Sequence, residues 1–201
     1  MPWYFAVAER DHEIQNPTST EKIRLLGERL RLGHDSHVLD IACGKGGPAL
    51  ILAGEFGCRI TGVERAAEFA SVARERVADA GLADRVAIVE RDATEFEIEP
   101  ARYDLAMCLG ASFVWGDLVG TLGALVPAAS EGGHVVVGEP YWRRWPLPDD
   151  VADGGYVPLA ETVERFHAAG LTLDTLIDSS PDDWDRLLHE DTNIKVNSPH
   201  T

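Results

Sequence analysis

The sequence is poor in basic residues and in cysteine. Lysine and arginine total 18 against 34 aspartates and glutamates, which gives a formal net charge of −16 over 201 residues. An excess of negative charge repels a phosphate backbone, so we do not expect nucleic acid as a partner. The three cysteines, Cys43, Cys58 and Cys108, are odd in number and irregular in spacing. This pattern argues against a disulfide framework and a zinc site, and we expect no metal.

Long hydrophobic runs are also lacking. No apolar stretch approaches the roughly 20 residues that span a bilayer, and the N-terminus has no basic-then-apolar leader. We therefore expect a cytoplasmic protein with no membrane partner. A chain of 201 residues is long enough for one α/β domain and too short for two ordinary ones.

Short apolar runs alternate with stretches of helical spacing, which is the rhythm of an α/β fold. A helix is expected at about 18–31 and another near 159–169. The strands are expected at about 36–41, 58–63, 86–90, 103–109 and 133–138. Right-handed crossovers then give a Rossmann-like, doubly wound sheet with strand order 3-2-1-4-5. The ligand crevice of such a sheet lies at the carboxyl ends, where strands one and four diverge.

A glycine-containing turn follows the first predicted strand. Residues 40–46 read Asp-Ile-Ala-Cys-Gly-Lys-Gly, a helix follows, and the second strand ends on Glu64. Doubly wound sheets bind nucleoside ligands with this order of elements, namely a strand, a glycine turn, a helix and an acid at the end of the next strand. Gly44-x-Gly46-x-x-Ala49 also fits the loose dinucleotide fingerprint, so an NAD-dependent oxidoreductase is one interpretation.

The charge of the turn favours a different adenosine cofactor. Asp40 would repel a pyrophosphate seated at the helix N-terminus. Pro48, near the first helical position, lacks an N–H that a phosphate would use. A cofactor with a sulfonium and an amino group, and without a phosphate, suits these residues better.

Four motifs in order resemble the class I S-adenosylmethionine (SAM)-dependent methyltransferases over about residues 18–178. They are the turn at 40–46, Glu64, the stretch 91–93 and the strand end at 103–112. The segments 12–17 and 138–142 are similar to a subgroup of small bacterial methyltransferases, akin to the cyclopropane-fatty-acid and ubiquinone-type enzymes that act on small molecules. One departure is Ala42, where the family more often has glycine.

The resemblance implies a role for each matching position. Residues 40–46 face the methionine part and the ribose, Glu64 accepts the ribose hydroxyls, residues 91–93 contact the adenine, and Leu109 lies beside the sulfonium. The cofactor-binding residues predicted in this way are Asp40, Ala42, Cys43, Gly44, Gly46, Glu64, Arg65, Asp92, Ala93 and Leu109.

Methyl transfer is then expected by in-line displacement onto a small-molecule acceptor, with S-adenosylhomocysteine (SAH) as the product. The main requirement is to hold donor and acceptor about 3 Å apart in a dry pocket. If a base is needed, His12 and Glu139 are the catalytic candidates. Aromatic residues near the expected mouth are the substrate-binding candidates, namely Tyr4, Trp115, Tyr141 and Trp142. A non-catalytic SAM-binding sensor or partner subunit is the other alternative.

The pattern fades toward the C-terminus. Residues 171–177 are predicted as a sixth strand, and only the short stretch 193–196 offers a seventh, which related folds place beside it. A missing seventh strand would leave an open sheet edge that favours a homodimer. We thus divide the chain into an N-terminal lid segment at 1–17, a SAM-binding domain at 18–178, and a C-terminal helix with a frayed tail at 179–201.

Overall fold

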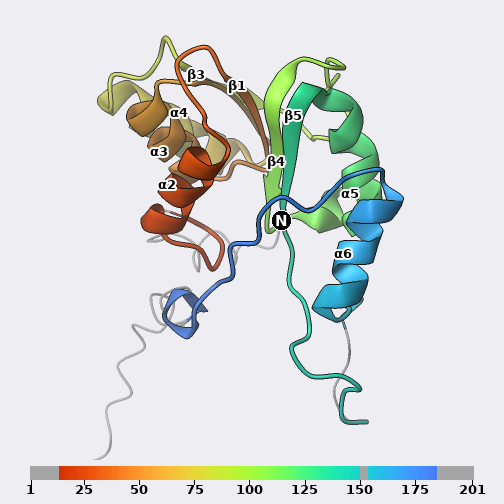
Figure 1. Cartoon of the computed structure of the whole chain (residues 1–201). Coiled ribbons are helices and arrows are strands. Elements are labelled where there is room, and N and C mark those ends of the chain that lie inside the picture. Colours follow the sequence, from red (N-terminus) through yellow and green to blue (C-terminus); the bar gives the residue numbers. More distant parts are fainter. Residues whose placement is uncertain (1–13, 150–153, 185–201) are drawn as a thin grey trace, which may run out of the picture.

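A computed structural model describes residues 14–149 and 154–184 (Figure 1). Its centre is one sheet of parallel strands in the order β3-β2-β1-β4-β5. The strands are β1 (His37–Ile41), β2 (Arg59–Glu64), β3 (Val86–Glu90), β4 (Tyr103–Leu109) and β5 (Ala129–Gly138). The predicted Rossmann-like, doubly wound α/β fold and its strand order are confirmed.

Helices cover both faces of the sheet, as Figure 1 shows. The helices are α2 (Thr20–Arg29), α3 (Gly47–Phe56), α4 (Ala67–Asp79), α5 (Leu118–Leu125) and α6 (Leu159–Ala168), with short 3-10 turns η1 (Ser112–Trp115) and η2 (Val126–Ala128). The group α2, α3 and α4 lies on one side, and α5 and α6 lie on the other. A sheet covered on both faces needs apolar residues at nearly every strand position, which explains the continuous apolar runs in the sequence.

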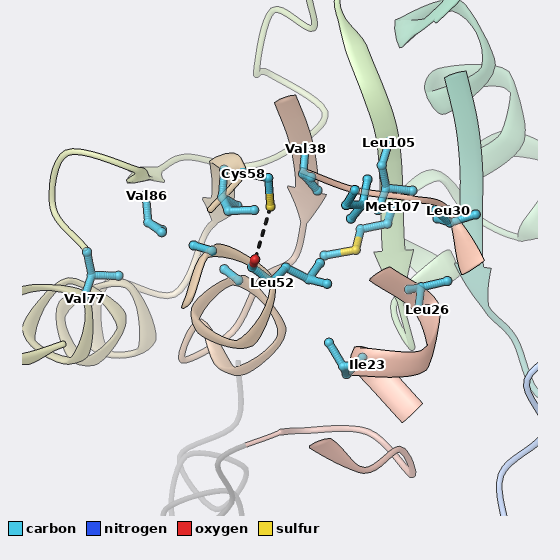
Figure 2. Close-up of a cluster of buried hydrophobic side chains, with 14 residues drawn as sticks. Ile23, Leu26, Leu30, Val38, Leu52, Cys58, Val77, Val86, Leu105 and Met107 are labelled. Carbon is cyan, nitrogen blue, oxygen red and sulfur yellow. Dashed lines mark hydrogen bonds between the residues drawn. The ribbon is translucent and has the colours of Figure 1, made fainter. Parts of the chain in front are cut away.

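Two buried clusters hold the layers together. In β1, Val38 points into the cluster beneath α2 and α3, and the next residue, Leu39, points into the cluster on the α5 side. Figure 2 shows the first cluster, where the thiol of Cys58 donates to the carbonyl of Leu52 at 3.3 Å. Successive strand residues point to opposite faces, so both faces of β1 help to fix its position.

The ends of the elements follow local rules. The Ser19 hydroxyl accepts the N–H of Lys22 and caps α2, a role that serine often has at a helix N-terminus. Strand β5 begins earlier than predicted. Its register with β4 shifts between Tyr103 and Leu105, and Gly132 has a φ of 76°. The Ser-Glu-Gly-Gly stretch has the composition of a turn, but it forms an irregular strand.

The predicted sixth strand at 171–177 is wrong. This segment has no strand structure and, shown in blue in Figure 1, crosses from α6 toward α2. The alternation of leucine and threonine imitates a strand, yet Leu173 and Leu176 stay 44% and 52% exposed. Burial therefore does not hold the segment beside β5. Its far end is held elsewhere, where the Ser179 hydroxyl donates to the carbonyl of Pro17.

Some predictions fall outside the described ranges. These are the seventh-strand candidate at 193–196, residues 1–13 of the lid segment and residues 185–201 of the tail. Of the predicted C-terminal helix, the described part is helical at 181–184. Over residues 14–149 and 154–184, no helix has both the length and the apolar character needed to cross a bilayer.

Candidate active site

A cavity of about 270 Å³ opens at the carboxyl ends of β1, β2 and β4. This is the crevice where β1 and β4 diverge, as expected for a doubly wound sheet. The predicted cofactor residues that line it are Asp40, Ala42, Cys43, Gly44, Glu64, Arg65, Asp92, Ala93 and Leu109. Sequence reasoning therefore found residues that the fold brings together, although they span about 70 positions of the chain.

Gly46 is the exception among the described residues, because it shapes the turn without lining the cavity. It is the N-cap of α3 with a φ of 75°, a left-handed conformation that suits glycine. Ala42 also has a positive φ, at 54°. The family's preference for glycine at that position follows from this backbone conformation, which costs an alanine roughly 1 kcal/mol.

Glu64 connects the motif turn to the next helix. Its Oε2 accepts the N–H of Gly44 at 3.0 Å, and its Oε1 accepts the N–H of Ala66 at 2.7 Å. The side chain is 5% exposed and lines the cavity. Each carboxylate oxygen has more than one lone pair, so Glu64 keeps acceptor capacity for the hydroxyls of a ribose.

Asp40 is a buried acid in the motif turn. Its Oδ2 has no hydrogen-bond partner among the described residues, and the residue is 2% exposed. Burial and then the nearby charge of Glu64 raise the pKa of Asp40 to about 8. A buried carboxyl without a partner is costly for the fold, and a cationic ligand group relieves that cost. The amino group of SAM is such a cation, and the family resemblance places the methionine part of SAM beside residues 40–46.

Asp92 also lines the cavity. Its Oδ1 accepts the backbone N–H of Thr94 at 3.0 Å and the Thr94 hydroxyl at 2.7 Å. Both bonds lower the pKa of Asp92, and the backbone bond has the larger effect. The guanidinium of Arg65 lies 3.7 Å from the other oxygen. An ionised acceptor is thus available where the family resemblance puts the adenine.

Gln15 and Asn16 also line the cavity, and the sequence had offered them only as part of a lid-like segment. The Gln15 Oε1 accepts the N–H of Lys45 at 3.0 Å, and the Asn16 Nδ2 donates to the carbonyl of Leu109 at 3.3 Å. The available signal was the polar pair directly before a proline and a capped helix. The other lining residues, which were not among the predicted cofactor-binding residues, are Gly47, Pro48, Val63, Phe69, Arg91, Thr94, Gly110, Ala111, Phe113 and Val114.

Of the two catalytic candidates, the structure describes Glu139, which is not among the cavity-lining residues of the described chain. His12 and Tyr4 are outside the described residues. Glu139 directly follows β5, is partly buried and bonds the hydroxyl of Ser112, while its Oε2 has no partner in the described chain. Burial raises the pKa of Glu139, and the Ser112 bond partly offsets this rise.

The aromatic candidates are held by their own neighbours. Trp115 ends η1 and packs against the buried cluster on the α5 side. The Tyr141 hydroxyl donates to Asp178 at 3.1 Å, and the backbone N–H of Trp142 donates to the carbonyl of Val157 at 3.1 Å. In the described part of the chain, the cavity lining includes none of these three residues.

Comparisons with known proteins agree with this geometry. Residues 38–133 match a family model described as a methyltransferase domain. The chain is 28% identical over 193 residues to the uncharacterised protein YjhP of Escherichia coli K12, a match that covers 92% of this chain and 77% of YjhP.

Two solved structures are more similar still in sequence. The SAM-dependent methyltransferase of Geobacter sulfurreducens in complex with SAH is 31% identical with a TM-score of 0.89. That of Thiobacillus denitrificans, also with SAH, is 30% identical with a TM-score of 0.88. Each match covers 95% of this chain and 79% of the other. The oxidoreductase and sensor alternatives are not favoured by these relatives. The chain therefore belongs to the class I SAM-dependent methyltransferases and is an enzyme that uses SAM as its methyl donor.

Proposed function

We propose that this methyltransferase methylates a small-molecule substrate that binds beside the ends of β4 and β5. Glu139 is then the general base that removes a proton from this substrate. The observation that carries the proposal is the Oε2 of Glu139, a buried oxygen without a partner in the described chain. The N–H of Gly110 donates to the carbonyl of Gly138 at 3.0 Å, which ties the two strand ends together directly before Glu139. A general base would act from such a position, because the family resemblance puts the sulfonium beside the end of β4.

The environment of Glu139 suits that role. Burial raises its pKa, and a carboxylate with a raised pKa binds a proton more strongly. A hydrogen bond with the Ser112 side chain partly offsets this rise in pKa. SAM, when bound, supplies an electrophilic methyl group on a sulfonium. The acceptor class that needs such a base is one that loses a proton on methylation, such as an amine, a thiol or a phenol.

We extend the proposal to the substrate contacts. Trp115, Tyr141 and Trp142 form part of an apolar wall around the acceptor. The side-chain bond of Tyr141 to Asp178 and the backbone bond of Trp142 to Val157 support a fixed position for the segment that carries two of them. The roles of His12 as a base and of Tyr4 as a substrate contact rest on the sequence. The net charge of −16 supports a small molecule over a nucleic acid. The boundaries at 17 and 178 and the cytoplasmic location remain predictions.

Glu139→Gln should lower kcat by about 100-fold or more, because general-base help contributes about that much. The measurement is SAH release with a panel of thiols, amines, phenols and carboxylates. In the wild type, kcat should rise with pH through the raised pKa of Glu139, since the ionised form is the base. This rise should vanish in the variant, while the affinity for SAH stays within about twofold.

The matched control is Glu131→Gln, which changes an exposed glutamate on the same strand. It should leave both kcat and its pH profile unchanged. Full turnover by Glu139→Gln on an acceptor that the wild type methylates would refute the role of Glu139.

We also propose a homodimer through the edge of the sheet. Within residues 14–149 and 154–184, β5 pairs only with β4, so its outer backbone groups are not paired in the sheet. Light scattering in dilute solution should give twice the chain mass of 21.9 kDa. A monomer at all concentrations tested would contradict this prediction.

A further inference from the structure

Residues 15 and 16 connect the two loops that border the cavity. Gln15 bonds Lys45 in the turn after β1, and Asn16 bonds Leu109 at the end of β4. These strands are the pair that diverges at the ligand crevice. The Gln15–Asn16 pair therefore lies across the opening between them, and both side chains line the cavity.

The bond to Lys45 determines the orientation of the Gln15 amide. A backbone N–H is a donor, so the atom that meets it at 3.0 Å must be the amide oxygen, Oε1. The nitrogen, Nε2, then carries two N–H groups. Among the described residues, these N–H groups have no hydrogen-bond acceptor. Gln15 thus offers free donors in the cavity.

The same cavity offers a free acid. The Oδ2 of Asp40 is buried without a partner in the described chain. A lone acid suits an ammonium group, and an amide N–H₂ suits a carboxylate. An α-amino acid carries both groups on one carbon. Asp40 and Glu64 would together repel a carboxylate that had no donor of its own.

We propose that Gln15 recognises the carboxylate of the amino-acid end of SAM through Nε2, while Asp40 takes the ammonium. Gln15 is then a specificity-determining residue that distinguishes the full cofactor from adenosine thioethers that lack the carboxylate. Its contribution is affinity and orientation at one end of the cofactor.

The position of Gln15 is well supported by its surroundings. A Cβ added at Gly44 would lie 2.0 Å from the Gln15 Oε1, so the glycine allows the amide to lie directly on the turn. Two residues further on, the carbonyl of Pro17 accepts the hydroxyl of Ser179. Lys22, at the start of α2, is paired with Asp183. These contacts hold the segment before any ligand arrives, which limits the entropy lost on binding.

The test compares three ligands by calorimetry. SAH has both the carboxylate and the ammonium, its decarboxylated analogue keeps only the ammonium, and 5′-methylthioadenosine has neither. The wild type should prefer SAH to the decarboxylated analogue. Gln15→Glu keeps an acceptor for Lys45 and removes the donor, so it should reduce this preference at least tenfold. Its affinity for 5′-methylthioadenosine should stay within twofold.

Other outcomes would overturn the inference. An equal loss for all three ligands would mean that Gln15 only shapes the turn, and an unchanged preference would mean that it does not contact the carboxylate. Gln15→Met, which keeps a similar volume, provides a second variant should Gln15→Glu fail to fold. A wild type that binds SAH and its decarboxylated analogue equally would contradict the inference without any variant.

Discussion

Glu64→Ala should lower the affinity for SAH by about 100-fold or more, which corresponds to about 2.7 kcal/mol. The substitution removes the acceptor predicted for the ribose hydroxyls. It also removes the partner of two N–H groups, those of Gly44 and Ala66. A buried donor left without a partner costs about 1–3 kcal/mol, so the turn at 40–46 loses its shape as well. The measurement is calorimetric titration with SAH.

The chain offers a matched control for this variant. Glu90 is aligned with Glu64 in the register of β2 and β3, but it is exposed and paired with Arg74. Glu90→Ala should change SAH affinity by less than twofold, because an exposed ion pair contributes little. Glu64→Gln keeps the side-chain volume and one acceptor oxygen, and it should fall between the two. Wild-type affinity in folded Glu64→Ala would contradict the role of Glu64.

The affinity for SAH should rise about tenfold between pH 6 and pH 7. The pKa of Asp40 in the ligand-free protein is raised to about 8, so the acid is protonated over this window. The α-amino group of the ligand is protonated over the same window. Their pairing requires ionised Asp40, so binding releases a proton and becomes easier as the pH rises. When one proton is released on binding, the affinity rises by a factor of ten, or 1.36 kcal/mol, for each pH unit.

Two controls isolate the role of Asp40 in this pH dependence. The ligand 5′-methylthioadenosine lacks the amino group, so its affinity should not change between pH 6 and pH 7. Asp40→Asn should bind SAH weakly and without the pH dependence, because the titrating group is gone. Titrations in buffers of different ionisation enthalpy should show about one proton released by the wild type. An SAH affinity that stays constant or falls from pH 6 to pH 7 would refute this account.

The sequence predicted the sheet and the cofactor end of the cavity because both depend on local patterns. Strands buried on both faces read as apolar runs, and the residues at their carboxyl ends meet at one edge. Asp40 and Glu64 could therefore be placed near each other without coordinates. The position of Ala42 in the left-handed region likewise agrees with its alignment to a family glycine.

The features that the sequence did not predict depend on contacts between distant segments. Asn16 and Leu109 are 93 positions apart, and no local pattern indicates that their side chain and carbonyl meet. The misassigned strand at 171–177 has the same origin, since its alternation is local and its anchor at Pro17 is remote. The bond between Tyr141 and Asp178 also joins distant positions, so no local pattern predicts it.

The most direct test of the central claim is calorimetric titration of the wild-type protein with SAM and SAH, with NAD as the comparison ligand. Our account predicts micromolar binding of SAM and SAH, one molecule per chain, and no binding of NAD. Binding of NAD without SAM or SAH, or no binding of any of the three, would contradict the assignment of the cavity.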